Sequence, residues 1–414
     1  MQDVNVDVLV IGAGPSGCVA AAYLQQHDVS VKVVEKSQFP RFVIGESLLP
    51  RCMDHFEEVG LLDVLNKQGF EIKRGARFIR GNTICEFDFS DKFTDGYNWT
   101  WQLPRADFDQ VIAQELIKKG VDIAFMEEVV GVRFSEEGSS VITIKKASGE
   151  IYKINAKFII DSSGYGRVLA RLLNLDKPSE IPQHSSIFSH VKDKNRPEGV
   201  EGTLITFDVI DKDTWFWVIP FSNGNTSVGF VGKTEFIDSF EGTASERLIE
   251  MLNISEYYSA RFKGVDFLFE PKVIQNYSKS VKQLYGKGYA LTGNSAEFLD
   301  PVFSSGVTFA TESGLMAAKL ITKDLHNEKV DWEKEYSHYI KKGVNAFASY
   351  VKEWYTGNLQ TIFFEGTNNP EIKRQICSVL AGYVWDQSNP FVKNHDRLIK
   401  TVAKIIELEN KGVK

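Results

Sequence analysis

The chain has 414 residues, with 48 Lys and Arg against 55 Asp and Glu, and a formal net charge of −7. A chain of this length forms roughly two to three domains of ~150 residues and can bury a large apolar core without disulfide or metal staples. With 43% hydrophobic and 25% charged residues, the composition excludes a collagen, a largely disordered chain and a polytopic membrane protein. The acidic balance argues against nucleic acid as the main partner.

The cysteine and histidine patterns exclude several kinds of site. Cys18, Cys52, Cys85 and Cys377 are far apart and form no C-x-x-C pair, which argues against a dithiol centre and is typical of reduced thiols in a cytoplasm. The seven histidines show no metal-ligand spacing, so no metal is expected. The acidic N-terminus is unlike a signal peptide, and no apolar run reaches the ~20 residues of a membrane helix. We therefore expect a cytoplasmic protein without stable membrane insertion.

A strand–turn–helix–strand unit begins the chain. Residues 6–11 predict a buried parallel strand, 16–26 a helix and 31–35 a second strand, and the turn reads G-x-G-x-x-G. The first glycine makes the tight turn, the second admits a pyrophosphate, and the third lets helix and strand pack closely. A plain glycine turn is the alternative, but strand, motif, helix, strand and terminal acid together favour a dinucleotide site. The predicted contacts are Gly12, Gly14, Pro15, Ser16, Gly17, Glu35 and Lys36.

The later elements alternate between helices and strands. Apolar periodicity predicts a helix at 107–119, hairpins at 127–152, a core strand at 157–160 and a second, aromatic sheet at 203–231. A strand at 287–292 and a long helix at 305–322 follow, and the chain reads as helical from Trp332 onward.

Two further segments resemble the other FAD fingerprints of the flavoprotein monooxygenase superfamily. One is the strand that ends in Asp161 and Gly164, and the other ends in Gly293 and Asn294. The superfamily usually has Asp where Asn294 stands, and an amide can still form a hydrogen bond to a ribityl hydroxyl. The segment 103–109 resembles the superfamily's arginine-containing turn beside the flavin. The resemblance therefore implies FAD as cofactor, with further contacts from Arg105, Val129, Asp161, Gly164, Gly293 and Asn294.

Three segments resemble the flavin-dependent halogenases, in the branch that acts on phenols, pyrroles and carrier-bound substrates. They are the W-x-W-x-I-P run at 215–220, the segment 45–50 and the loop 300–307. The resemblance places Trp215 and Trp217 near the flavin as candidate catalytic residues, although alternating aromatics also suit an ordinary half-buried strand. The loop before the long helix would lie beneath the flavin, with contacts from Asp300, Pro301, Gly306 and Val307.

Lys73 is the third candidate catalytic residue. The segment 69–78 resembles the family segment whose lysine is thought to receive or orient hypohalous acid. A lysine in a partly apolar tunnel has a lowered pKa, and its ammonium can polarise an oxidant; a solvated surface lysine is the alternative. If 71–77 is one strand, Lys73 and Arg77 share a face and Arg74 lies on the other. The turn at Ser305 and Gly306 offers N–H groups to a halide.

The elements predict an α/β fold with an interleaved mixed-sheet substrate domain and a C-terminal helical cap, and the resemblance implies that the Rossmann-like FAD-binding domain is of the para-hydroxybenzoate hydroxylase type. The expected divisions are 1–80, 104–175 and 285–325 for FAD, 81–103 and 176–284 for substrate, and 326–414 for the cap. The resemblance implies halogenation of an electron-rich aromatic or carrier-bound substrate with reduced FAD, O2 and halide. No second G-x-G-x-x-G unit is present, so a separate flavin reductase is expected as partner. A monooxygenase, a geranylgeranyl reductase-like enzyme and an FAD-binding electron carrier stay open.

Overall fold

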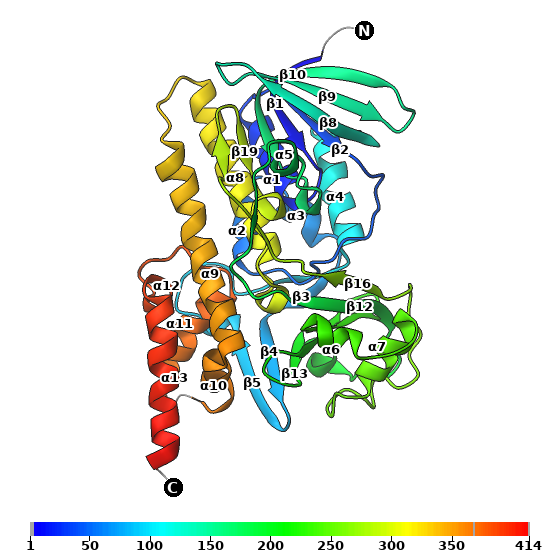
Figure 1. Cartoon of the computed structure of the whole chain (residues 1–414), viewed down its shortest axis with the longest axis vertical. Coiled ribbons are helices and arrows are strands. Elements are labelled where there is room, and N and C mark those ends of the chain that lie inside the picture. Colours follow the sequence, from blue (N-terminus) through cyan, green and yellow to red (C-terminus); the bar gives the residue numbers. More distant parts are fainter. Residues whose placement is uncertain (1–3, 367–368, 413–414) are drawn as a thin grey trace.

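A computed structural model describes residues 4–366 and 369–412. Two large sheets organise the molecule, one in the upper half of Figure 1 and one in the lower half. The C-terminal helices lie beside the lower sheet, on the left of Figure 1. The predicted α/β class with two mixed sheets and a helical C-terminal region is confirmed.

The first sheet is mainly parallel and carries the N-terminal glycine turn. Its order is β18-β19-β10-β1-β2-β7, and β8 and β9 extend it as a ribbon along β10. β1 pairs in parallel with both β10 and β2, so the carboxyl ends of these strands meet at one edge. The bounds are β1 Val4–Ile11, β2 Val31–Glu35, β7 Asp122–Phe125, β8 Glu127–Phe134, β9 Ser140–Lys146, β10 Ile151–Asp161, β18 Tyr285–Gly286 and β19 Tyr289–Leu291.

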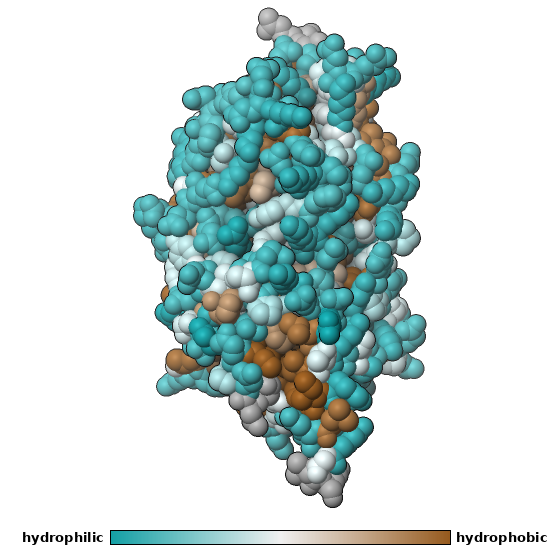
Figure 2. Space-filling view, turned by 90° about the vertical axis from the view of Figure 1, so that its left-hand side faces the viewer, coloured by the Kyte–Doolittle hydropathy of each residue, from teal (hydrophilic) through white to brown (hydrophobic). Residues whose placement is uncertain are grey.

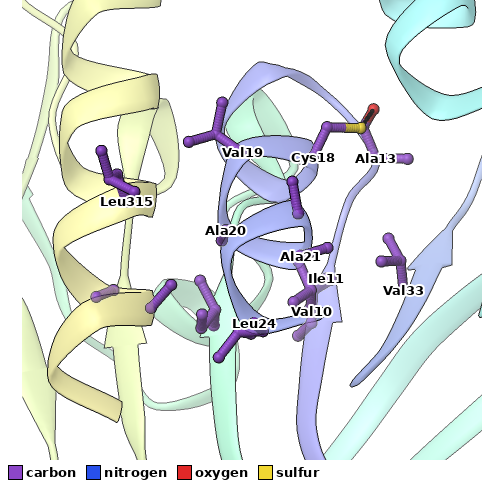
Figure 3. Close-up of a cluster of buried hydrophobic side chains, with 14 of the residues drawn as sticks. Val10, Ile11, Ala13, Cys18, Val19, Ala20, Ala21, Leu24, Val33 and Leu315 are labelled. Atoms are coloured by element: carbon purple, nitrogen blue, oxygen red, sulfur yellow. Dashed lines mark hydrogen bonds between the residues drawn. The ribbon is translucent and has the colours of Figure 1, made fainter. Parts of the chain in front are cut away.

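Helices α1 (Pro15–Gln26) and α8 (Gly306–Leu325) pack side by side against this sheet (Figure 3). They approach closely because α8 has a glycine at the contact: a Cβ on Gly314 would stand 2.5 Å from the Ser16 carbonyl oxygen. Figure 3 shows Val19 and Leu24 of α1 in the shared core, with Leu315 on the facing helix. The close contact ties the start of α1 to the helix that follows the predicted flavin loop.

The second sheet is mostly antiparallel, in the order β16-β12-β15-β14-β13-β4-β5. Its bounds are β4 Gly75–Arg80, β5 Thr83–Asp88, β12 Ser185–Lys192, β13 Thr206–Val209, β14 Trp215–Pro220, β15 Asn225–Gly232 and β16 Lys272–Gln275. Every residue of β14 is buried, so the alternation along this strand separates two apolar clusters rather than core from solvent. The predicted strand-rich region is confirmed as β13, β14 and β15.

Strand β4 differs from the expected division of the chain. The sequence places residues up to 80 with the FAD-binding segment, but β4 pairs in parallel with β13 and belongs to the second sheet. The apolar pattern of β4 cannot show which sheet it joins, because its partner β13 lies more than a hundred residues later in the sequence. The rest of the domain division stays a prediction. Two small ribbons connect the layers: β3 (Glu71–Lys73) with β6 (Thr100–Gln102), and β11 (Asp176–Pro178) with β17 (Lys279–Val281).

The remaining helices cover the sheets and form the C-terminal region. They are α2 Arg51–Glu58, α3 Leu62–Asn66, α4 Arg105–Lys118, α5 Val168–Leu172, α6 Thr234–Asp238, α7 Ala244–Leu252, α9 Tyr339–Thr356, α10 Asn358–Phe364, α11 Pro370–Leu380, α12 Pro390–Lys393 and α13 His395–Gly412. A π-helix at Trp332–His338 leads into α9. Figure 2 shows the face on the left of Figure 1: it is mainly hydrophilic, with a large apolar patch in its lower half and smaller apolar areas elsewhere. None of the helices in the described part of the chain is both long and apolar enough to span a membrane.

A buried ionic cluster joins α2, α8 and the start of α9. Glu312 of α8 accepts hydrogen bonds from Arg51 Nε at 3.0 Å, His55 Nε2 at 2.7 Å and the Tyr339 hydroxyl at 2.6 Å. Burial opposes ionisation of this carboxyl, but His55 and Arg51 hold its pKa well below the usual range. The cluster therefore stabilises the junction through an ionised glutamate.

Candidate functional site

The glycine turn between β1 and α1 forms one wall of a large cavity. Gly12 has φ of +98°, and a Cβ there would lie 2.6 Å from the Ser162 carbonyl oxygen. A Cβ on Gly17 would lie 1.9 Å from the Gly12 carbonyl oxygen, so this glycine allows α1 to pack on the turn. At Gly14 the nearest atom to a Cβ is Arg41 Nη2 at 3.7 Å, and the residue faces the cavity. The turn thus leaves open space at the N-terminus of α1, where backbone N–H groups favour a phosphate.

The cavity has a volume of about 500 Å³ and runs from the first sheet to the second. Most of the predicted site residues lie in its wall. They are Gly12, Gly14, Pro15, Ser16, Glu35, Lys36, Arg105, Val129, Gly164, Trp215, Trp217, Gly293, Asn294, Pro301, Gly306 and Val307. Residues from at least six separate segments therefore meet in one space, which is the arrangement that a long, extended cofactor requires.

Glu35 lies at the end of β2 with its carboxylate fixed in place. Its two oxygens accept hydrogen bonds from the backbone N–H groups of Ala13 and Ser37, both at 2.9 Å. The side chain is buried and borders the cavity next to the glycine turn, which suits a hydrogen bond to a ribose hydroxyl. Lys36 extends outward and forms an ion pair with Glu128 at 2.7 Å.

Arg105 holds the segment that leads from β2 to α2. It forms a bidentate pair with Asp109 at 2.8 and 3.0 Å, and its Nη1 donates to the carbonyl oxygens of Ile44 and Gly45 at 3.3 and 3.4 Å. Arg41 donates to the same Asp109 carboxylate at 3.0 Å and also borders the cavity. Arg41 was missed by the sequence analysis, since it stands in no motif and reaches Asp109 only in the folded chain.

Four predicted contacts lie behind the cavity wall. Gly17 is packed under the turn, and Ser305, 4% exposed, precedes α8. Asp161 caps α5, because its oxygens accept from the N–H groups of Ser163 at 3.0 Å and Leu169 at 2.7 Å. Asp300 accepts from the N–H of Val302 at 3.0 Å within the loop. These residues shape the wall, and whether they also contact the cofactor or a halide stays a prediction.

Lys73 is buried at the end of β3, just behind the cavity. Its ammonium donates to Ser47 Oγ at 2.8 Å and to the Leu48 carbonyl oxygen at 2.9 Å, and Ser47 borders the cavity. The ring of Phe89 lies 5.5 Å from Nζ. Burial lowers the pKa of Lys73 to about 7, as expected for a desolvated amine that has no carboxylate partner among the described residues. The alternative of a solvated surface lysine is wrong.

The expected face-sharing of Lys73 and Arg77 is also wrong. The segment is not one strand, because β3 ends at Lys73 in one ribbon and β4 begins at Gly75 in the second sheet. Arg74 lies exposed between them, and Arg77 forms ion pairs with Glu86 and Glu201. A period of two cannot be followed across a point where the chain changes sheets.

The two tryptophans of β14 border the cavity opposite the glycine turn. Trp217 Nε1 donates to Ser227 Oγ at 3.1 Å, and Trp215 Nε1 donates to the Tyr355 hydroxyl of α9 at 3.1 Å. Tyr355 in turn donates to Asp300 Oδ2 at 3.0 Å, and Tyr277 donates to the same oxygen at 3.0 Å. The Asp300 carboxylate thus links the predicted flavin loop to the second sheet and the C-terminal helices. No sequence signal pointed to either tyrosine.

Comparisons with known proteins also point to FAD. The family described as "FAD binding domain" matches residues 5–239. A 1H-pyrrole-2-carbonyl-[peptidyl-carrier protein] chlorinase of Pseudomonas fluorescens is 27% identical over 413 residues. The match covers 93% of this chain and 91% of the relative.

Two solved structures extend the comparison. A flavoprotein/dehydrogenase from Cytophaga hutchinsonii has 51% sequence identity and a TM-score of 0.96, and the match covers 98% of this chain and 100% of that one. A triple mutant of the flavin-dependent brominase Bmp2 has 26% identity and a TM-score of 0.82, with 94% and 98% covered.

The residues present fit FAD. Gly14 leaves a cradle where a larger side chain would fill the cavity, and α1 presents its N-terminus there. The fixed Glu35 carboxylate and the arginines around Asp109 supply an acceptor for a ribose and positive charge near the phosphates.

Proposed function

Because the chain belongs to the FAD-binding domain family and is an FAD-dependent oxidoreductase, we propose that it halogenates an electron-rich aromatic substrate with reduced FAD, O2 and a halide. Reduced FAD, when bound, would give two electrons to O2 and the halide would give two more, so that one oxygen atom ends in hypohalous acid and the other in water. The observation that carries the proposal is the buried ammonium of Lys73, held by a cavity-lining serine.

Lys73 has the properties that this chemistry needs. With a pKa of about 7, it is partly protonated near neutral pH, so it can both donate to and accept from a polar oxidant. Its position behind Ser47 puts it at the cavity but out of bulk water. Trp215 and Trp217 give the facing wall a large aromatic surface, which suits a flat aromatic substrate and limits loss of the oxidant to water. We further propose that N–H groups at Ser305 and Gly306 bind the halide.

Two further proposals concern the substrate and the electron source. The similar chlorinase acts on a pyrrole group attached to a peptidyl-carrier protein, so we include carrier-bound aromatics among the candidate substrates. The chain has no second G-x-G-x-x-G unit for a nicotinamide cofactor, so we propose that a separate flavin reductase supplies reduced FAD.

The test supplies the purified protein with a flavin reductase, NADH, FAD, O2 and bromide. Phenols and pyrroles are offered both free and on a carrier protein, and mass spectrometry detects the bromine isotope doublet in the product. Lys73→Met should lower bromination to background while reduced FAD is still reoxidised, because the oxidant loses its positioned partner. Arg74→Ala, at the adjacent exposed residue, should retain activity.

Two results would count against this function. Equal bromination by Lys73→Met and Arg74→Ala would remove Lys73 from the reaction. Products that gain one oxygen atom and no bromine would assign the protein to the monooxygenases, which share this fold.

A further inference from the structure

One aromatic side chain of the cavity, Tyr165, is exposed and has no place in the reaction described so far. It stands in the single turn Gly164–Gly166 that follows β10, and it borders the cavity. The side chain is 46% exposed, whereas Trp215 and Trp217 in the facing wall are buried. Tyr165 therefore offers ring surface to whatever occupies the cavity.

The exposed surface of this ring faces the cavity and not the outside of the molecule. Burial raises the pKa of the Tyr165 hydroxyl, and the positive charge of Arg105, another residue of the cavity wall, acts in the opposite direction. The hydroxyl therefore lies inside the protein, although much of the residue is accessible. Water against an apolar ring face costs free energy, so an aromatic occupant is favoured there.

A neighbouring ring supports Tyr165 on one side. Phe298 meets it edge to face, with ring centroids 5.5 Å apart, and packs against Tyr277 at 5.7 Å in the same way. Phe298 also lies beside the start of α8, because a Cβ on Gly306 would stand 3.7 Å from its Cε2. The phenol ring is thus held next to the loop that leads into α8.

The order of the strands indicates which part of FAD reaches this ring. The carboxyl ends of β19, β10, β1 and β2 follow one another along one edge of the first sheet. Glu35 at the end of β2 suits a ribose, and the glycine turn after β1 suits the pyrophosphate. The half of FAD beyond the pyrophosphate, which carries the isoalloxazine ring, must then extend toward β10 and β19. Tyr165 follows β10 and lies on that side of the turn.

We propose that the exposed face of Tyr165 stacks against the isoalloxazine ring of bound FAD and contributes to the affinity for this ring. The inference uses FAD binding alone and does not depend on halogenation. Stacked aromatic rings attract each other beyond the effect of their buried area, so loss of the phenol ring should weaken FAD binding about tenfold.

The test measures binding of FAD and of ADP to the full-length protein freed of flavin, by isothermal titration calorimetry. ADP shares the adenosine and two phosphates of FAD but lacks the isoalloxazine ring. Tyr165→Leu should weaken FAD binding about tenfold and leave ADP binding unchanged. Tyr165→Phe keeps a ring that can stack and should bind FAD like the intact protein. Tyr257→Leu, which removes a tyrosine of similar exposure (43%) outside the cavity wall, should change neither affinity.

Three results would overturn the inference. Equal FAD affinity in Tyr165→Leu and the intact protein would show that the ring makes no contact with the cofactor. An equal loss of FAD and ADP affinity would assign Tyr165 to the adenosine half or to the fold. An equal loss of FAD affinity in Tyr165→Phe and Tyr165→Leu would assign the contact to the hydroxyl. If Tyr165→Leu fails to fold, Tyr165→Gln, with a polar side chain suited to an exposed position, decides by the same comparison.

Discussion

Replacing Lys73 with methionine should change how the stability of the fold depends on pH. Burial lowers the pKa of Lys73 from 10.5 to about 7, whereas in the unfolded chain the amine returns to its ordinary value. Between these two pKa values the unfolded chain binds a proton that the folded chain does not. The free energy of unfolding must therefore rise with pH in this window, and the contribution is most unfavourable below pH 7. Methionine binds no proton in either state, so the variant lacks this dependence.

The size of the effect follows from the two pKa values. When the unfolded chain binds one proton more than the folded chain, the free energy of unfolding rises by ~1.36 kcal/mol per pH unit. Because the folded amine is half titrated near pH 7, the free energy of unfolding should rise by about 2 kcal/mol from pH 7 to pH 9. Urea denaturation of the intact protein and of Lys73→Met at both pH values measures it. The stability of the intact protein relative to the variant should increase by this amount at pH 9.

Lys194→Met is the control, because the Lys194 side chain is 60% exposed. The difference in the free energy of unfolding between the intact protein and Lys194→Met should be the same at pH 7 and pH 9. A difference for Lys73→Met that is the same at pH 7 and pH 9 would refute the reasoning. It would mean that the Lys73 ammonium is hydrated in the folded protein and is not shielded behind the cavity wall.

Four further changes test the cofactor site and the fold. Gly14→Val should abolish FAD binding and leave folding intact, because the side chain enters the cavity; full yellow occupancy would contradict this. Gly17→Ala should lower the free energy of unfolding by about 1–3 kcal/mol, because its Cβ would stand 1.9 Å from a carbonyl oxygen; an unchanged urea midpoint would show that the turn can shift. Asn294→Asp should tighten FAD binding through a charge-assisted hydrogen bond to the ribityl chain, and calorimetry showing a weaker complex would misplace this residue. Glu312→Gln should cost ~3–5 kcal/mol at pH 7, and the loss should shrink below the ordinary carboxyl pKa; an equal loss at pH 3 would count against an ionised Glu312.

The parts of the structure that the sequence predicted depend on interactions between residues close together in the chain. The βαβ unit and the roles of its glycines follow from strand and helix periods and from steric limits, which act over a few residues. The W-x-W run was predicted as a strand for the same reason. The complete burial of this strand was not predicted, because burial of both its faces depends on helical and loop segments far away in the sequence.

The side chains that complete the site come from distant pairings. His190 meets Glu46 across 144 residues, and Tyr355 meets Asp300 across 55; neither pair has a spacing that a motif could show. The error at Arg77 has a related cause, since the chain moves from a small ribbon into the second sheet at Arg74. Sequence patterns therefore predicted most of the residues that line the cavity, whereas the hydrogen-bonded network around it required the folded chain.

Asp300 accepts two hydrogen bonds from separate parts of the chain, so these parts cannot be exchanged independently with those of a relative. One carboxylate oxygen receives the hydroxyls of Tyr277 and Tyr355, and Tyr355 also receives the indole N–H of Trp215. A chimera that takes its C-terminal helices from a relative without this tyrosine would leave the loop carboxylate and the indole both short of a partner. A chimera in the C-terminal helices should therefore take α9, the loop that carries Asp300 and β14 from the same relative.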